Sequence, residues 1–494
     1  MNNLSSRQRK LVYAGCIVFL LIPIVYLGAP TSEDVLPGTK TAVSGGLLAQ
    51  MRVEHDLGES TLGEIDPSSA AMNLVLLGLR GPAAGILHLQ ALEYQEKKNW
   101  GKLKTTVDSI IKLQPHYVEI WKFQGWNLAF NVSREWDKVA DRFYWVKEGI
   151  KFLQLGTNRN KTTTILFHNV GDFMGRKFGN SDEKKFFRRF FVDDPNNERF
   201  PNGSSDPELN PEGKDNYLVA KDWFDISNDK DANGYPVKGM THVFFRQAPS
   251  RALFDHVSAK QGDYAADMKE KGEAEDRRGL SEVDRLALED EDRRIWEEQN
   301  RRGWDDAYAE WTEVYGNDIF LGLNDVRYKL NCSADELAAL AKENGVTLAT
   351  QRKVWEQNVK MVNYRFWRNL ADCERDPLAV SAHRAIADGK VAYSRGEISD
   401  AEDKQGILQP SPAELRFADG LNTMAQVLAK YPTLSYHDAY IDEILLAAYY
   451  WETVQQYNNK QPPENYPLKQ FVMLHAARRP DIEREFAIEN RSSF

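Results

Sequence analysis

The chain has 494 residues, with 63 Lys and Arg against 73 Asp and Glu, which gives a formal net charge of −10. This length allows two or three domains, and the negative charge argues against nucleic acid as a main partner. The 12 Trp, 20 Tyr and 23 Phe residues supply the rings of a packed core, which excludes a largely disordered chain.

The N-terminus predicts a membrane anchor. Three basic residues within 1–10 directly precede an uncharged, mainly apolar run at 11–29. A helix of about 20 apolar residues spans the hydrocarbon core of a bilayer, and the basic flank stays on the cytoplasmic side. We therefore expect a cytoplasmic N-terminus at 1–10, a single transmembrane signal anchor in the lipid bilayer at 11–29, and a body on the other side. A cleavable secretory signal is the alternative, but Leu27 and Pro30 suit a cleavage site poorly.

Residues 30–68 are rich in Gly, Ser, Thr and Pro, which predicts a flexible linker. Residues 69–190 then follow a pattern of helix, short turn and helix. The first helix of a helical repeat is indicated by Trp121 with Gly125 and again by Phe167 with Gly171. Residues four apart lie on one helix face, so the ring fills a groove and the glycine lets two helices approach closely.

A second small-residue pair, Gly389 and Ala401, lies twelve residues apart downstream, where we expect the two helices of one repeat to cross. These spacings resemble those of tetratricopeptide-repeat (TPR) proteins over about 80–180 and 378–432. The resemblance is degenerate, because the intervals are not a strict 34 residues. It implies a mainly α fold with a TPR-like α-solenoid body.

The phrases from Gly125 to Ser133 and from Trp145 to Gly149 are also similar to a family of uncharacterised bacterial membrane-anchored proteins. That resemblance implies no activity. It does imply a location, namely the bacterial inner membrane with a single pass, a cytoplasmic N-terminus and a periplasmic body.

Residues 191–260 are dense in Pro, Gly, Asn and Asp, which predicts an irregular central insertion. Within it we expect a short helical piece near Asn216 to Phe224 and a short strand or extended stretch at Met240 to Arg246. An acidic helical region follows at 261–316. It holds 18 Asp and Glu against 9 Lys and Arg between Asp263 and Glu313, which is typical of a solvated, charge-rich helix.

The remaining elements are predicted by helical spacing and caps. One helix face carries Trp304, Tyr308, Trp311 and Tyr315. In the helical repeat region 317–458, Ser333 and Glu336 form a capping box, Gly345 ends that helix, and Asp376-Pro377 begins another. We also expect one long helix with Trp355, Val359, Val362, Phe366 and Leu370 on one face, and a buried final helix over Ile441 to Val454. The C-terminal tail, 459–494, contains several prolines and is expected to wrap the surface.

The sequence shows no motif for a known chemistry. It has no Gly-rich phosphate loop, no dinucleotide fingerprint, no Gly-x-Ser-x-Gly elbow and no histidine pair with zinc-helix spacing. We therefore predict no catalytic residue, which favours a non-enzymatic role. Cys332 and Cys373 would lie in an oxidising compartment, and their spacing leaves open whether they form a disulfide.

One segment resembles a metal loop. Asp229, Asp231, Asn233 and Gly234 occupy positions one, three, five and six of a calcium-loop pattern, in which alternate side chains converge on a hard cation. The acidic residue of position twelve is replaced by Met240. The alternative is an Asn-Gly surface turn without a metal.

These features predict a membrane-anchored extracytoplasmic scaffold that mediates protein–protein interaction in the cell envelope. Stacked helix pairs would bind an extended peptide or a partner helix on a concave face. Two alternatives remain open. One is an envelope enzyme with a site in the 190–260 insertion, where His242 is a candidate, because long inserts are often functional. The other is a cell-wall or carbohydrate-binding protein that uses surface aromatic residues.

Overall fold

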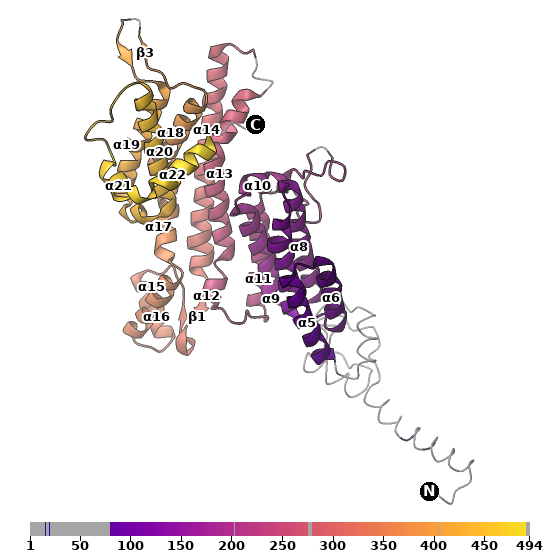
Figure 1. Ribbon diagram of the computed structural model, residues 1–494. Helices are drawn as coiled ribbons and strands as arrows, with labels where there is room; N and C mark the ends of the chain where they lie inside the picture. Colours follow the sequence, from indigo (N-terminus) through magenta and orange to yellow (C-terminus); the bar gives the residue numbers. More distant parts are fainter. Residues whose placement is uncertain are drawn as a thin grey trace, which may run out of the picture. The chain divides into compact units, whose positions relative to one another are not determined.

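The computed structural model describes residues 80–490, with gaps at 202, 275–278 and 404, together with Gly15 and Phe19. Apart from those two residues, the predicted cytoplasmic N-terminus, transmembrane anchor and linker lie outside the described residues. Within the described part, no helix has the length and apolar character needed to cross a membrane. This part is mainly α-helical (Figure 1).

The described chain divides into two compact units. The N-terminal unit comprises 80–214 and Trp223–Lys238, and the C-terminal unit comprises Asp215–Asp222 and 239–490. Helix α11 (Asn216–Ala232) is therefore divided between them. Each unit has its own core and is described by itself.

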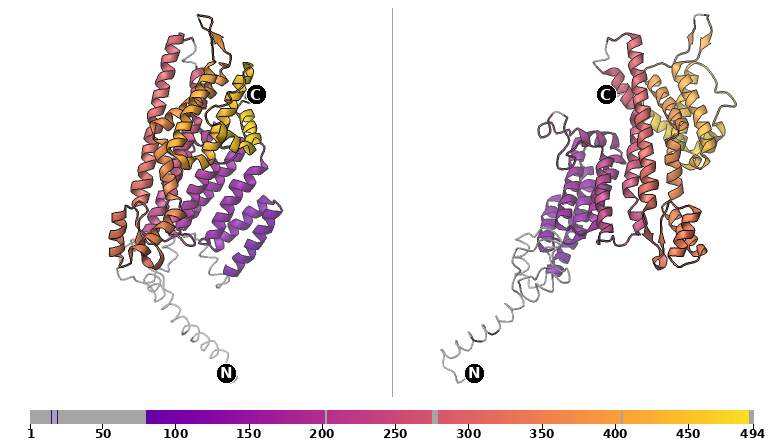
Figure 2. Two further views of the ribbon diagram at one scale, coloured as in Figure 1. Left: turned by 90° about the vertical axis from the view of Figure 1, so that its left-hand side faces the viewer. Right: turned by 180° about the vertical axis from the view of Figure 1, so that it is seen from behind.

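The N-terminal unit contains helices that lie side by side in chain order, joined by short turns (Figure 2). Each of the first helices packs on the next one along the chain, from α5 to α9. On α6 the residues at helical spacing, Leu103, Val107 and Ile110, are buried and supply this packing. The bounds are α5 Arg80–Glu96, α6 Trp100–Leu113, α7 Val118–Trp126, α8 Val139–Arg159, α9 Thr164–Asp172 and α10 Lys184–Val192.

The C-terminal unit is built on two long helices, α13 and α14, which pack along each other (Figure 1). Two short antiparallel hairpins interrupt the helices: β1 pairs Phe320 with Tyr328 of β2, and β3 pairs Ala401 with Gln409 of β4. The helix bounds are α12 His242–Phe245, α13 Ala248–Glu273, α14 Glu282–Ala309, α15 Ala334–Glu343, α16 Leu348–Met361, α17 Tyr364–Glu374, α18 Pro377–Ser394, α19 Pro412–Lys430, α20 Asp438–Tyr457, α21 Lys469–Leu474 and α22 Arg479–Glu489. The strand bounds are β1 Phe320–Leu321, β2 Arg327–Tyr328, β3 Ala401–Glu402 and β4 Leu408–Gln409.

Some helices continue into shorter turns. π-Helical turns follow α7 at Asn127–Asn131 (η1), α9 at Phe173–Lys177 (η3) and α14 at Glu310–Val314 (η5). Short 3₁₀ turns lie at Val132–Glu135, Tyr315–Asn317, Leu323–Asp325, Pro432–Tyr436 and Ala476–Arg478.

The predicted aromatic face is confirmed in the C-terminal unit. Trp304, Trp311 and Tyr315 are buried, and Tyr308 is partly buried beside them. The ring of Phe254 on α13 lies 5.5 Å from that of Trp311. The predicted buried final helix is the middle of α20, which packs on α19 and α22.

The predicted helix ends are also confirmed. Ser333 Oγ accepts the backbone N–H of Glu336 at 3.3 Å, and the Glu336 carboxylate accepts the backbone N–H of Ser333 at 2.8 Å. Gly345, just after α15, has a φ of +65°, as expected for a glycine beyond a helix C-terminus. At the start of α18 the Asp376 carboxylate accepts the N–H of Leu378 at 3.0 Å.

The single helix expected around Trp355 to Leu370 is wrong. The chain breaks at Asn363, which has a φ of 49°, so that α16 and α17 are separate helices. Asparagine tolerates this left-handed conformation better than most residues. The break turns Tyr364 into the core, where its carbonyl accepts the Trp311 indole N–H at 3.1 Å.

The irregular insertion predicted at 191–260 is only partly right: the described residues of 193–215 form neither helix nor strand, but the rest of the segment is mainly helical. Helix α11 begins at Asn216 as expected but continues to Ala232, and α13 already begins at Ala248. Composition was misleading here, because Tyr217, Ala220 and Phe224 recur at helical spacing and are buried. The expected strand at Met240 to Arg246 is the short helix α12, since short apolar runs do not distinguish a helix from a strand.

Two further predictions concern the last third of the chain. Cys332 and Cys373 are both free, so the disulfide left open by their spacing is not formed. Cys373 is buried, with its Sγ 3.4 Å from the Tyr440 hydroxyl.

The C-terminal tail includes α21 and α22, and α22 packs on α20.

Candidate binding site

The predicted repeat residues Trp121 and Gly125 lie buried on α7. A Cβ atom added to Gly125 would lie 2.6 Å from Cγ of Leu153, and one added to Gly149 on α8 would lie 2.7 Å from the Gly125 carbonyl oxygen. Distances this short leave no room for a side chain, so α7 and α8 are in close contact at these two glycines. Gly125 therefore lies at a close contact between α7 and α8, and the glycine on the other side of that contact is Gly149.

The second predicted pair, Phe167 and Gly171, is buried on α9. The ring of Phe167 lies 6.0 Å from that of Trp223, and the ammonium of Lys230 lies 4.3 Å from its centre. This aromatic residue therefore fills a space beside α11, as a packing residue does.

Of the third predicted pair, Gly389 and Ala401, only Gly389 lies at a helix crossing. A Cβ atom added to Gly389 on α18 would lie 2.8 Å from the ring of Phe417 on α19, which marks a close helix crossing. Ala401 does not take part, because it is exposed in β3. The small residue on the facing helix is Gly420, whose added Cβ would lie 2.7 Å from Ile386. The twelve-residue spacing from Gly389 does not reach the second helix, because the β3–β4 hairpin lies between the two helices and α19 begins only at Pro412.

The calcium-loop residues do not form a loop. Asp229 and Asp231 lie in the last turn of α11, and side chains two apart on a helix point to different sides. The carboxylate of Asp231 accepts the N–H of Val237 at 2.8 Å, and the Asn233 amide donates to the Asp229 carbonyl at 2.8 Å. In the part of the chain that the structure describes, no three His, Cys, Asp or Glu side chains are grouped to hold a metal. This geometry does not fit the calcium-loop pattern.

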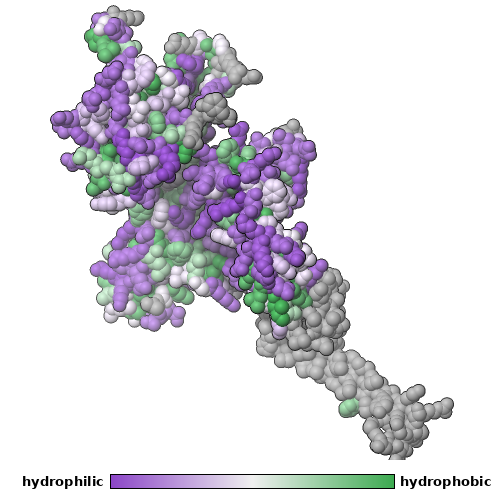
Figure 3. Space-filling view, viewed as in Figure 1, coloured by the Kyte–Doolittle hydropathy of each residue, from purple (hydrophilic) through white to green (hydrophobic). Residues whose placement is uncertain are grey.

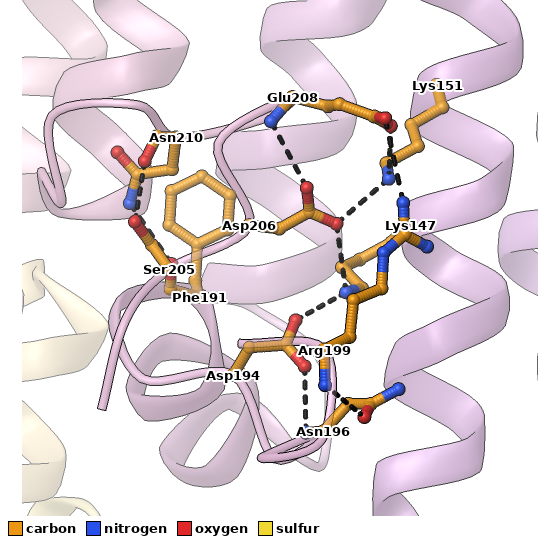
Figure 4. Close-up of polar contacts among 10 residues, drawn as sticks. All are labelled: Lys147, Lys151, Phe191, Asp194, Asn196, Arg199, Ser205, Asp206, Glu208 and Asn210. Carbon is orange, nitrogen blue, oxygen red and sulfur yellow. Dashed lines mark hydrogen bonds and ion pairs between the residues drawn. The ribbon is translucent and has the colours of Figure 1, made fainter. Parts of the chain in front are cut away.

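The loop that follows α10 is held by a buried ion cluster (Figure 4). Lys147 on α8 pairs with Asp194 and lies 3.1 Å from Asp206, which also lies 2.9 Å from Lys151. Figure 4 shows the Asp206 carboxylate pointing between the two ammonium groups. The cluster joins two positions of the loop to one helix.

The charges of this cluster are compensated. Lys151 also pairs with Glu208, and Arg199 lies 3.6 Å from Glu208. Burial acts to lower the pKa of Lys151, but hydrogen bonds to Glu208 and Asp206 outweigh it and raise that pKa. Burial likewise acts to raise the pKa of Asp206, yet its two lysine partners lower it. Both shifts favour the charged forms of Lys151 and Asp206, so these ion pairs hold the loop against α8.

A different arrangement is found where the π-helical turns η1 and η3 meet. The rings of Phe130 and Phe173 pack edge to face at 5.2 Å, and the indole of Trp126 stacks on Phe130 at 3.9 Å. Trp126 nevertheless stays 50% exposed. π-Helical turns are rare and are frequent at functional sites, and here two of them are side by side.

Beside this stack lies a buried cation. The Lys177 ammonium is 4.8 Å from the centre of the Phe130 ring, and the residue is only 7% exposed. Burial lowers the pKa of Lys177. Among the described residues, no carboxylate lies within ion-pair distance of this ammonium. A buried charge without a close counter-ion is costly, so it favours an anionic or carbonyl group from a ligand.

The side-chain amide of Asn127 on η1 has a buried nitrogen without a hydrogen-bond acceptor among the described residues. Its Oδ1 accepts the amide of Asn131 at 3.0 Å and that of Gln95 at 3.4 Å. Its Nδ2 is buried and has no hydrogen-bond partner within the described ranges. Trp126 and Lys177, which both contact the ring of Phe130, define together with Phe130 what we call the π-turn site.

Sequence reasoning missed this site. The residues of η1 fall within the phrase that starts at Gly125, but nothing in that phrase distinguishes a π turn from an α turn. The extra residue of a π turn becomes visible only through its hydrogen bonds.

No protein-family model matches this chain, and comparisons with curated proteins and with solved structures return no significant match. The fold therefore defines the class only as a mainly α-helical protein of two units. Its function must be argued from the π-turn site itself.

Proposed function

We propose that this protein is a membrane-anchored, extracytoplasmic helical-repeat scaffold that binds a partner protein in the cell envelope. The observation that carries the proposal is the π-turn site, where an exposed tryptophan stack adjoins a buried, uncompensated lysine. Helices α5 to α9 would form a short array of TPR-like pairs, and the two π turns would lie on its binding face.

The chemistry of the site indicates what the partner presents. An exposed ring such as Trp126 is a typical anchor in protein interfaces, where buried tryptophans contribute most of the binding energy. The ammonium of Lys177 is a hydrogen-bond donor. The matching ligand is a peptide segment with an apolar side chain over Trp126 and a carboxylate or carbonyl oxygen facing Lys177.

Site-specific crosslinking tests the binding site. A photoreactive phenylalanine at position 126 should capture a defined partner in intact cells. Trp136 is the matched control, because it is also a surface tryptophan, 43% exposed and stacked on Trp145, but lies outside both π turns. Equal capture from both positions would contradict the proposal.

Binding to the captured partner is then measured with purified proteins. A hot-spot tryptophan contributes about 2 kcal/mol or more, so Trp126→Ala should weaken binding about 30-fold. Trp136→Ala should leave the affinity unchanged. An unchanged affinity of the Trp126→Ala variant would reject the π-turn site as the interface.

The proposed membrane topology is tested separately. Protease added to spheroplasts should degrade the body and leave a fragment that carries the anchor at 11–29. In intact cells the outer membrane should protect the body. Full protection in spheroplasts would place the body in the cytoplasm and overturn the proposed location.

A further inference from the structure

The C-terminal unit contains a cavity of about 420 Å³ between α20 and the segment 459–482. Pockets for small molecules have volumes of roughly 300–1,000 Å³. The apolar part of the wall includes Leu445, Ala448, Val472, Met473 and Ile482. Figure 3 shows apolar side chains gathered over α21, where Met473 and Leu474 are 66% and 77% exposed.

Three side chains that are charged at neutral pH line this cavity, Glu452, Lys469 and Arg479, and together they carry a net charge of +1. Arg479 and Glu452 pair at 2.9 Å, and Arg479 also lies 3.2 Å from Glu483. Lys469 is different: its ammonium donates to the Glu464 carbonyl oxygen at 2.6 Å. Among the described residues no carboxylate lies within ion-pair distance of it. Lys469 is therefore the positive charge of the wall that lacks a paired carboxylate.

The backbone at this position is strained. Leu468, directly before Lys469, has a φ of 64°, which non-glycine residues rarely adopt. Such a conformation persists where the surrounding structure enforces it, and strained residues cluster at active sites, ligand clamps and switch regions. Here it places the start of α21, and with it Lys469, at the wall of the cavity.

We propose that this cavity binds a small amphipathic molecule with an apolar body and one carboxylate. The apolar body would lie against Leu445 and Val472, because this removes apolar surface from water on both sides. The carboxylate would bind the ammonium of Lys469 in a charge-assisted hydrogen bond. This site lies in the C-terminal unit and does not depend on the π-turn site.

The probe is a medium-chain fatty acid that carries a photoreactive diazirine on its chain. It is added to membranes that contain the full-length protein, and the labelled residues are mapped by mass spectrometry. Labelling should concentrate on the residues of the cavity wall and be competed by decanoate, but not by decylamine. Labels scattered over the surface, or equal competition by the amine, would overturn the proposal.

Two matched pairs of variants test the wall itself. Ala476 lines the cavity and Ala477 does not, although both are exposed neighbours in one 3₁₀ turn. Ala476→Phe should abolish the specific labelling, whereas Ala477→Phe should preserve it. Lys469→Gln should weaken competition by decanoate about tenfold, as expected for loss of a charge-assisted hydrogen bond. Lys353→Gln, on the exposed side of α16, should have no effect. Unchanged competition in Lys469→Gln would exclude the carboxylate contact.

Discussion

The backbones of Gly125 on α7 and Gly149 on α8 approach so closely that a Cβ atom at Gly149 would lie 2.7 Å from the Gly125 carbonyl oxygen. The same added atom would lie 2.9 Å from the backbone nitrogen of Ala129, which belongs to η1. The glycine contact therefore sets how near α8 lies to the π turn that carries the proposed binding residues.

Gly149→Ala should accordingly destabilise the N-terminal unit. The added atom meets the Gly125 carbonyl oxygen and the nitrogen and Cβ of Ala129, none of which can move without the backbone, so a cost of about 1–3 kcal/mol is expected. The control is Gly101→Ala on α6, where an added Cβ has nothing within 4 Å. Alanine favours a helix over glycine, so that variant should be neutral or slightly stabilised. Urea denaturation measures both, and equal effects would contradict the close contact.

Lys147→Met should release the loop that follows α10. The substitution leaves the carboxylates of Asp194 and Asp206 buried without this lysine, and breaking such a pair costs about 3–5 kcal/mol. Lys151→Met should cost less, because Glu208, one of its partners, is exposed. Amide hydrogen exchange of residues 193–215 measures the release. Equal protection in the wild type and in Lys147→Met would show that the cluster does not hold the loop.

Stability should fall at alkaline pH because of His383. This buried ring has its Nδ1 2.8 Å from Glu443 and its Nε2 3.2 Å from Glu374. Burial acts to lower the pKa of His383, but the two carboxylates outweigh it and raise that pKa well above 6.5. The folded state therefore holds a proton that the unfolded state releases. This contribution is fully present below about pH 6.5 and is lost as pH rises through the folded pKa.

Glu374 gives the opposite dependence at low pH. Burial acts to raise its pKa, yet His383 and the neighbouring hydrogen bonds lower it below 4.5. Its contribution is present above about pH 4.5 and is lost as pH falls through the folded pKa. Urea midpoints should therefore decline on both sides of neutral pH. His383→Gln should flatten the alkaline side, and an unchanged alkaline slope would rule out His383 as its cause.

The capping box of α15 should change the pKa of one carboxyl group, that of Glu336, which can be measured directly. Hydrogen bonds from Lys329 and from Ser333 lower the pKa of Glu336 to about 2. The stabilisation from this carboxylate should be lost as pH falls from about 4.5 towards 2. Carbon-detected NMR titration of Glu336 checks the value. Lys329→Gln should raise the Glu336 pKa, while Lys353→Gln should not change it.

Helix ends and helix faces could be predicted because they depend on residues only a few positions apart in the chain. Ser333 reaches Glu336, Asp376 reaches Leu378, and Trp304 and Trp311 lie on one face whatever the rest of the fold is. The packing roles of Trp121 and Gly125 could be predicted for the same reason. Their four-residue spacing puts a ring and a small residue on one helix face, which implies a close neighbouring helix.

The identity of that neighbour was decided only by the tertiary structure. Nothing near Gly125 in the sequence points to Gly149, and nothing near Gly389 points to Gly420 instead of Ala401. The π-turn site joins residues of two helices, so its lysine and its tryptophan are brought together by packing and not by spacing. Sequence alone therefore determined the helical character and the local caps of this protein, because those arise from short-range contacts. The tertiary structure decided which residues meet at the helix contacts, how the ion cluster holds the loop after α10, and where the two candidate sites lie. All of these depend on contacts between distant segments, which exist only once the chain has folded.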